Sequence, residues 1–289
     1  MGSSGYWEND TVSIELITLS ENTAGKPGFA SEWGLSILVK TDETTILFDT
    51  GGRDAAVRNA DRLNIDLGLV DKIVISHGHA DHTGGLVKVL ERKHPVDVIA
   101  HPSIWDLKYV KRPYEGHHAF IGIPFKRELL EFYGANFILS KEPYQISDNI
   151  LTSGEISIVT DFESIEPIFF TKTNNTYTSD SIPDDLALVI NSPKGLVIIL
   201  GCGHRGMINT IYHARQITGE KRVHTIIGGT HLFPKTTEQR TQTINALKEI
   251  GVERIGVSHC TGFEASQMLA EAFGDRFFGN HAGSVISID

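Results

Sequence analysis

The stretch Ser76-His77-Gly78-His79-Ala80-Asp81-His82-Thr83-Gly84-Gly85 places three imidazoles and one carboxylate within six residues. It follows the apolar segment 72–76, whose composition is typical of a β-strand. Imidazole and carboxylate are ligands for Zn²⁺, and they also serve other divalent metals such as Mn²⁺, Fe or Mg²⁺. In an extended turn, His77 and His79 project to one side and can share one ion. Asp81 and His82 then point to a neighbouring position, so the stretch predicts a site for one or two divalent metal ions.

The segments on either side predict an α/β fold in which sheets are covered by helices. Period-2 alternation and apolar runs predict strands at 11–17, 35–39, 45–48, 72–76, 96–100, 186–191, 196–200, 223–227, 254–258 and 285–288. Helices are expected at 55–63, 84–92, 125–133, 207–217, 237–250 and 264–273. This order suggests two sheets sandwiched by helices in one domain spanning 1–289. Residues 1–10 are expected to be a tag or disordered, and 101–180 an irregular insert that covers the site, with an exposed loop at 171–180.

The central motif resembles the His-x-His-x-Asp-His signature of the metallo-β-lactamase superfamily, and Asp49-Thr50-Gly51 resembles the Asp-x-Gly turn that precedes it. The resemblance covers nearly the whole chain. It implies an αββα sandwich with a metal site, often dinuclear, at one sheet edge. His77 and His79 would then bind the first metal, and Asp81 and His82 the second. The resemblance also implies a last His ligand after a late strand, which is His259.

The family's remaining ligands are replaced here. No His lies between His118 and His204, and the Gly-Asp that would supply a bridging carboxylate is Gly201-Cys202-Gly203-His204. His204 is therefore expected as a replacement metal ligand, or else as a residue that supports the ligands or contacts substrate. Cys202 either ligates as a thiolate or lies buried under the site.

Three further residues are candidates near the site. Asp185 can supply a carboxylate or cap a turn. Asp49 belongs to the same set of additional ligands or residues that support them. His231 follows the predicted strand at 223–227 and two glycines, and it has either a catalytic, substrate-facing role or a structural one.

Several short motifs occur together and resemble one subgroup of the superfamily, related to the archaeal dihydropterin synthase of methanopterin biosynthesis. They include Glu32-Trp33-Gly34, Asp184-Asp185-Leu186, Gly228-Gly229-Thr230-His231 and His259-Cys260-Thr261-Gly262. The resemblance implies a hydrolase-type enzyme in which metal-activated water attacks a phosphate- or ester-containing small molecule, with Asp81 orienting the water. A transferase that condenses a pterin-methyl diphosphate with a ribofuranosylaminobenzene phosphate is the alternative. A non-catalytic metal-binding sensor is the second alternative.

Composition limits the partners. The chain has 289 residues, with 26 Lys and Arg against 36 Asp and Glu, so its formal net charge is −10. This charge argues against a broad nucleic-acid or anionic-membrane surface. The expected substrate is an anionic small molecule, because metal ions would make the pocket itself cationic. No apolar stretch approaches the ~20 residues that span a bilayer. Two cysteines favour a reducing, cytoplasmic location. The oligomeric state stays open. Lys108, Lys111 and Arg112 form a small basic group, either phosphate-binding or on a solvated helix face.

Overall fold

A computed structural model describes residues 13–114 and 116–288 of the chain. Its first sheet has seven strands in the order β17 (Val285–Ile288), β1 (Ile14–Ser20), β2 (Ser36–Lys40), β3 (Thr45–Phe48), β4 (Lys72–Val74), β5 (Val96–Ala100) and β8 (Ala135–Leu139). Strands β17, β1, β2 and β3 pair antiparallel, whereas β3, β4, β5 and β8 are parallel. The carboxyl ends of β3, β4, β5 and β8 therefore lie at one edge of this sheet.

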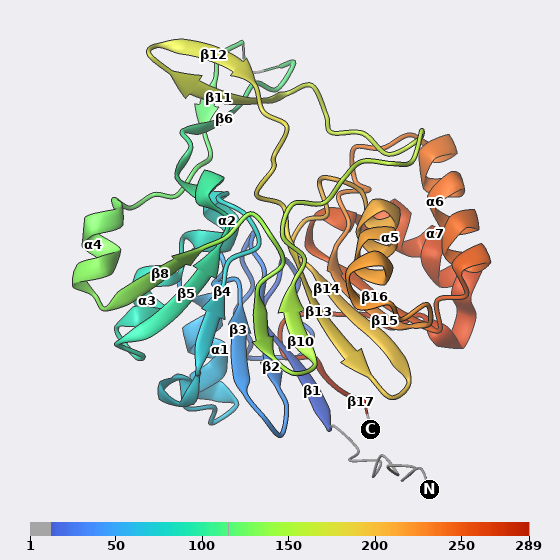
Figure 1. The fold of residues 1–289 in the computed structure, drawn as a ribbon, viewed down its shortest axis with the longest axis horizontal. Coiled ribbons are helices and arrows are strands. Elements are labelled where there is room, and N and C mark those ends of the chain that lie inside the picture. The colour runs from blue at the N-terminus through green and yellow to red at the C-terminus, as the bar shows by residue number, and fades with distance from the viewer. Residues whose placement is uncertain (1–12, 115, 289) are drawn as a thin grey trace, which may run out of the picture.

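The second sheet has six strands in the order β16 (Arg254–Ser258), β15 (Val223–Gly229), β14 (Gly195–Leu200), β13 (Ala187–Ser192), β10 (Ile150–Thr152) and β9 (Gln145–Ser147). Strands β14, β15 and β16 are parallel, so their carboxyl ends also share one edge. The two sheets pack against each other through one face each, in the middle of the molecule (Figure 1).

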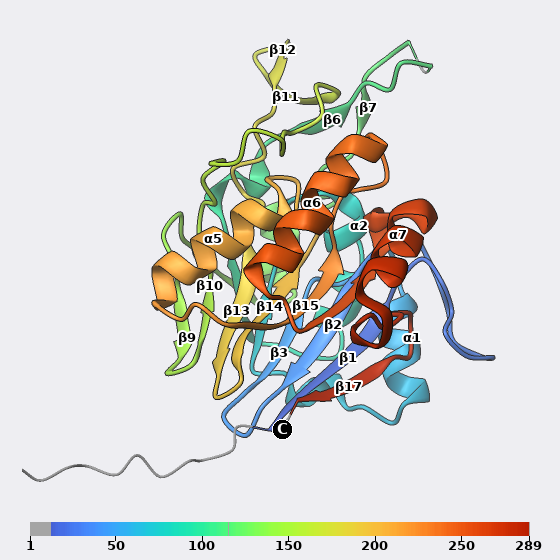
Figure 2. The same ribbon diagram turned by 90° about the vertical axis from the view of Figure 1, so that its right-hand side faces the viewer.

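Alternating side chains build three apolar layers. Ile37 and Val39 of β2 pack between the sheets against Val197 and Ile199 of β14, whereas Leu38 faces the opposite side of its sheet. That outer side is covered by α1 (Ala55–Arg62), α3 (Leu86–Leu90) and α4 (Arg127–Phe132). The outer side of the second sheet is covered by α5 (Met207–Thr218), α6 (Thr237–Ile250) and α7 (Phe263–Phe273), which Figure 2 shows together. The predicted αββα sandwich is confirmed.

A small third sheet stands above the edge where the parallel strands of the two main sheets end (Figure 1). Its order is β12 (Thr176–Ser179), β11 (Phe169–Thr173), β6 (Lys108–Val110) and β7 (Ala119–Phe120). The loop predicted at 171–180 was wrong, because β11 and β12 form a hairpin whose turn residues, Asn174 and Asn175, both have positive φ. Asn tolerates that backbone conformation, which matches the twist of a two-residue hairpin turn.

The helix predicted at 84–92 is shorter in the structure, where α3 spans only Leu86–Leu90. A separate short helix that was not predicted, α2 (Ala80–Thr83), precedes it, with Gly84 and Gly85 between the two. A Cβ at Gly84 would lie 2.0 Å from the carbonyl oxygen of Gly52. The glycines therefore allow the motif to pack directly on the loop after β3. The first strand begins at Ile14 among the described residues, and the predicted strand residues 11 and 12, like the segment 1–10, lie outside them.

Within residues 13–114 and 116–288, no helix is long and apolar enough to cross a membrane.

Candidate metal centre

The site lies where the strands of both main sheets end. His77 follows β4, and Cys202 and His204 follow β14. His231 and His259 follow the neighbouring strands β15 and β16. Because these strands run parallel within each sheet, their ends bring the side chains to one edge of the sandwich. The sequence motif and three segments more than 100 residues away thus meet at a single place.

The two halves of the motif have different backbone conformations. Residues 77–79 are extended, and Nε2 of His77 lies 3.0 Å from Nδ1 of His79. His79 then caps α2, so Asp81 and His82 lie in a helical turn rather than in the extended turn that was expected. The helical turn still brings Oδ2 of Asp81 within 3.9 Å of Nε2 of His82. The motif therefore presents its four polar side chains toward the same edge.

Asp49 orients two of these imidazoles. Its Oδ1 accepts a hydrogen bond from the backbone N–H of Ser76 (2.7 Å), and its Oδ2 accepts from the Ser76 hydroxyl (2.6 Å) and from Nδ1 of His82 (2.7 Å). Because the Ser76 hydrogen points to Asp49, its oxygen accepts from Nδ1 of His77 at 2.9 Å. Both imidazoles are thus held with Nε2 turned toward the cluster, as outer partners of metal ligands commonly arrange.

His259 is oriented in the same way by the segment after β1. Its Nδ1 lies 2.9 Å from Oδ1 of Asn22, which can only accept, so Nδ1 carries the proton. Glu21 accepts from the backbone N–H of His259 at 2.7 Å. Nε2 of His259 then faces Oδ2 of Asp81 at 3.3 Å. Trp33 donates its indole N–H to the same oxygen at 3.1 Å.

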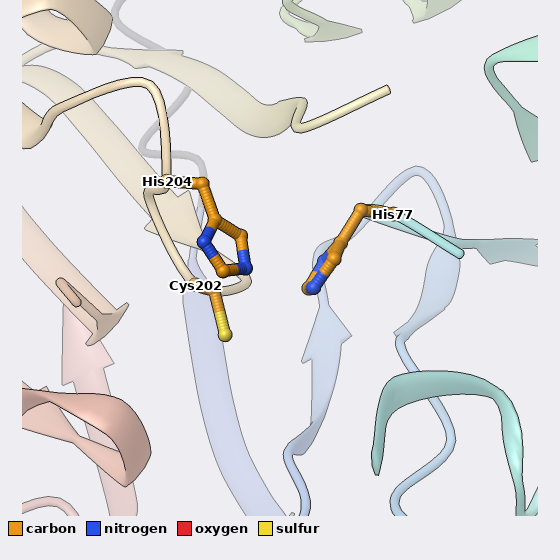
Figure 3. A group of neighbouring side chains, drawn as sticks. All are labelled: His77, Cys202 and His204. Carbon is orange, nitrogen blue, oxygen red and sulfur yellow. The ribbon is translucent and has the colours of Figure 1, made fainter. Parts of the chain in front are cut away.

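Two groups of ligand atoms meet at Cys202. His77, Cys202 and His204 form one group, and His82, Cys202 and His259 form the other, with the ligand atoms of each group within 4.8 Å of one another. Sγ of Cys202 lies 3.1 Å from Nε2 of His82. Figure 3 shows the His204 ring facing the His77 ring, with Cys202 on the same loop as His204. Cys202 therefore stands between the two candidate positions.

Burial keeps three of the imidazoles neutral. It lowers the pKa of His77, His79 and His204 well below the usual range, and repulsion among the neighbouring His residues lowers it further. Burial opposes protonation of His82 as well, but the carboxylates of Asp49 and Asp81 outweigh it and raise its pKa to about 9. Burial raises the pKa of Asp81, but the neighbouring His82 and His259 outweigh this and lower it. A neutral buried imidazole is the form that ligates a metal.

The donor set fits a divalent cation. Nε2 of His79, both nitrogens of His204 and Nε2 of His259 are buried and have no hydrogen-bond partner. A buried polar group without a partner costs about 1–3 kcal/mol, so several of them in one cluster call for a shared ligand. Imidazoles with a thiolate and a carboxylate suit Zn²⁺ and related transition metals.

Two predicted residues have other surroundings. Oδ2 of Asp185 accepts from the backbone N–H of Arg205 at 2.8 Å, which supports the turn that carries His204. Among the described residues, Asp185 joins none of the groups of potential ligands. His231 lies beside His204, with ring centroids 4.2 Å apart, and contacts Glu166. Sequence reasoning missed Glu166, because it lies in a loop without any local pattern.

The basic group expected near residues 108–112 is divided by the structure. Lys108 lies on strand β6 and is fully buried, so it is not part of a solvated helix face. Its Nζ contacts Asp180 at 3.0 Å and Asp184 at 2.7 Å. Asp184 in turn accepts from the backbone N–H of Gly78 at 2.8 Å. Lys108 therefore connects the small sheet to the loop between His77 and His79.

A cavity of about 770 Å³ opens above the cluster. Its floor includes His79, Asp81, Cys202, His204 and His259, and His231 lines its wall. Aromatic and basic side chains form much of the rest: Trp33, Arg112, Tyr114, Phe120, Phe169 and Phe233. The volume lies within the range of small-molecule sites. The small sheet supplies Val110, Phe120 and Phe169 to this lining.

Comparison with known proteins agrees with this arrangement. Residues 34–139 match the model of the metallo-beta-lactamase superfamily. The chain is 34% identical, over 95% of its length and 96% of the relative's, to 7,8-dihydropterin-6-methyl-4-(beta-D-ribofuranosyl)-aminobenzene-5′-phosphate synthase from Methanocaldococcus jannaschii. The chain belongs to the metallo-β-lactamase superfamily. A second relative from the same organism, uncharacterized, is 32% identical over 93% of the chain and 98% of its own length.

Solved structures of the superfamily show the same fold. The chain superposes on Tm1679, described as a metal-dependent hydrolase of the beta-lactamase superfamily, with a TM-score of 0.81 and 28% identity. The match covers 95% of this chain and 99% of that one. YhfI from Bacillus subtilis, a metallo-beta-lactamase fold protein, has a TM-score of 0.59 at 12% identity, over 96% and 100% of the two chains. Like the named superfamily members, the chain is an enzyme, of hydrolase or synthase type.

Proposed function

We propose that the chain is a metal-dependent hydrolase that acts on a phosphate- or ester-containing, anionic small molecule. The observation that carries this proposal is the buried cluster of partnerless ligand atoms at the floor of the cavity. His77, His79 and His204 would hold one cation, and Asp81, His82 and His259 a second. Cys202 lies between the two groups and would replace the bridging carboxylate of the superfamily as a thiolate. The donor chemistry favours Zn²⁺.

A divalent cation held there lowers the pKa of water and polarises a phosphoryl or carbonyl oxygen. The chain's own residues do the positioning. Asp81 is partly exposed to the cavity, and its Oδ2 accepts a hydrogen bond from the Trp33 indole N–H. We assign Asp81 the orientation of the attacking water and acceptance of its proton. His231 lies on the cavity wall, where it can contact the substrate as it reacts.

The cavity walls support a substrate that has both an aromatic and an anionic part. Trp33, Phe120 and Phe169 offer ring faces and edges, and Arg112 offers a positive charge. A guanidinium suits phosphate because it can donate two parallel hydrogen bonds. The formal net charge of −10 means that the protein surface as a whole does not attract anions. Cations bound at the cluster, together with Arg112, would attract an anionic substrate locally.

Hydrolysis is tested with the full chain loaded with Zn²⁺ or Mn²⁺ and offered bis(p-nitrophenyl) phosphate and a panel of lactones. We expect turnover that is lost on chelation and in His79→Ala. His94→Ala is a matched control, because Nδ1 of His94 bonds the backbone oxygen of Leu90 and the residue lies outside the cavity lining. Turnover that survives both chelation and His79→Ala would refute the assignment.

A second candidate is a synthase reaction, and the 34% identity to the dihydropterin synthase over 95% of the chain favours it. The aromatic walls would then hold a pterin-methyl diphosphate and a ribofuranosylaminobenzene 5′-phosphate. The arylamine would attack the methyl carbon, and diphosphate would leave. Mass spectrometry of an incubation with both compounds decides between the candidates. The condensed product indicates the synthase, and its absence alongside phosphodiester or lactone cleavage indicates the hydrolase.

We also propose a reducing, cytoplasmic location. Cys202 and Cys260 are both free and buried within the site. A thiol that must ligate a cation is retained in a reducing compartment. No nucleic-acid or membrane partner is needed for the reactions proposed above.

A further inference from the structure

A third group of potential ligand atoms lies beside the two that the superfamily motif supplies. Glu166, His204 and His231 have ligand atoms within 4.8 Å of one another. Glu166 comes from the loop that follows β10, and His231 follows β15. The side chains of Glu166 and His231 are only 12% and 14% exposed, and His204 is buried. The three residues come from separate parts of the sequence and converge through the fold.

The polar atoms of this group do not satisfy one another. Nδ1 of His231 and Oε2 of Glu166 are 3.1 Å apart, yet neither atom has a hydrogen-bond partner, so they face each other without the alignment of a hydrogen bond. Both nitrogens of His204 are also buried without a partner. Two ligands of one tetrahedral Zn²⁺ at ordinary bond lengths are about 3.3 Å apart. The contact therefore resembles two ligands that share an ion.

Lys235 orients the carboxylate. Its Nζ contacts Oε1 of Glu166, which leaves Oε2 directed toward the imidazole of His231. Ligating carboxylates are commonly held in this way by a partner on the second oxygen. The positive charge of Lys235 also weakens the attraction for a cation. Binding at this position should therefore be weaker than at the positions served by His77 and Asp81.

The backbone turns His231 toward the group. His231 has φ of 48° and His259 has φ of 55°, in the left-handed region that non-glycine residues rarely adopt. Each residue follows one of two neighbouring parallel strands, β15 and β16. Such conformations cost about 1–3 kcal/mol and persist where the surrounding structure enforces them, which is often at functional sites. The same strained backbone conformation therefore occurs at His259, which faces the motif, and at His231, which faces Glu166.

We propose that Glu166, His204 and His231 form an additional cation site, for Zn²⁺ or a similar transition metal, next to the two motif positions. Two imidazoles and one carboxylate are the protein ligands of many catalytic zinc sites, and they leave one coordination position open. Because His204 and His231 line the cavity, that open position can take an anionic group of a bound molecule. His204 has two nitrogens and can serve both neighbouring groups, with loss of its ring proton. The site does not depend on which reaction the enzyme performs.

The test counts Zn²⁺ ions bound by the full chain in solution, by calorimetric titration of chelator-stripped protein with Zn²⁺ alone. Glu166→Gln keeps the shape of the side chain and removes its charge. We expect the wild type to bind one Zn²⁺ per chain more than Glu166→Gln, in the weakest phase of the titration. Anomalous scattering at the zinc edge should place that ion between Glu166, His204 and His231.

Glu155→Gln is the matched control, because Glu155 also pairs with a His, at 2.9 Å from Nε2 of His101, but lies outside the cluster. It should bind as many ions as the wild type. If Glu166→Gln fails to fold, judged by its thermal transition, His231→Gln tests the same site from the other strand end. Equal stoichiometry in the wild type and the folded variant would overturn the proposal, as would an anomalous map with the motif positions filled and no peak at Glu166.

Discussion

The carboxylate of Asp49 orients two imidazoles of the candidate metal centre. It accepts directly from His82 and, through the Ser76 hydroxyl, holds His77. It is itself fully buried and has φ of 58°. The Asp-x-Gly turn seen in the sequence therefore serves to orient ligands, and it does so from behind the cluster.

Replacing Asp49 with Asn should lower zinc affinity about 10–100-fold, because the partner that sets the orientation of His82 and His77 loses its charge. Competition with a chromophoric chelator measures the change. Asp97→Asn is the control, since Asp97 pairs with Lys72 away from the cluster and should leave the affinity unchanged. An Asp49→Asn protein that binds zinc as tightly as the wild type would contradict this role.

Asp185 makes folding depend on pH. Burial raises its pKa to about 7, above the ordinary value of 3.8. As pH rises, the unfolded chain therefore loses this proton first, and the folded state loses stability between about pH 4 and pH 7. Below that window both states are protonated and the contribution is constant.

Asp185→Asn should remove this loss, because the amide keeps an acceptor for the Arg205 N–H and cannot ionise. The variant should gain stability over the wild type as pH rises through this window, by up to a few kcal/mol. Urea unfolding of chelator-treated protein at several pH values measures the difference. A difference that is constant across the window would count against the assignment.

At the scale of elements, a buried ion cluster links the small sheet to the loop that carries His77 and His79. Lys108 of β6 is buried against Asp180 and Asp184, and Asp184 accepts from Gly78 between two metal-facing histidines. The β11–β12 hairpin is connected to the same cluster through Asp180, which directly follows β12. The elements above the cavity and those beneath it thus share one buried ion cluster.

Lys108→Met should destabilise the protein by about 3–5 kcal/mol, because two buried carboxylates lose their partner. Chemical denaturation measures the change. Lys88→Met is the control, since Lys88 pairs with Glu91 at the exposed surface and its loss should leave the unfolding midpoint unchanged. Equal midpoints for the two variants would show that the buried cluster adds nothing to stability.

Across the whole molecule, the candidate metal centre takes its side chains from both main sheets. His77 and His82 come from the side of the first sheet, and His204 and His259 from the side of the second. A cation shared by both groups would therefore connect the halves of the sandwich. Binding to the folded state alone also stabilises it by mass action.

Chelation should lower the melting temperature by roughly 7 °C. This shift corresponds to the loss of about 4 kcal/mol of binding free energy, the value for a free cation concentration about 1,000 times the dissociation constant. Calorimetry with and without a chelator checks this. The double variant His79→Ala, His259→Ala should melt at the same temperature in both conditions. If the wild type melts at the same temperature with and without the chelator, no cation connects the two sheets.

The sequence alone determined several local features. Periodicity located α6 and β16 at their observed bounds, and the spacing of His77, His79, Asp81 and His82 indicated a metal site. These signals work because strand and helix periods and short ligand spacings lie within a few residues. The polar residues of β11 and β12 resembled a loop, since most β12 side chains are exposed and most β11 side chains are only half-buried.

Only the tertiary structure decided which distant residues join the cluster. Glu166, Asn22 and Lys108 carry no local pattern, and their contacts span dozens of residues or more along the chain. The position of Cys202 between the two groups likewise depends on how β14 packs beside β4. A sequence records which groups are available and how a short segment bends. Which of them share an ion depends on where the packing of two sheets brings the strand ends together.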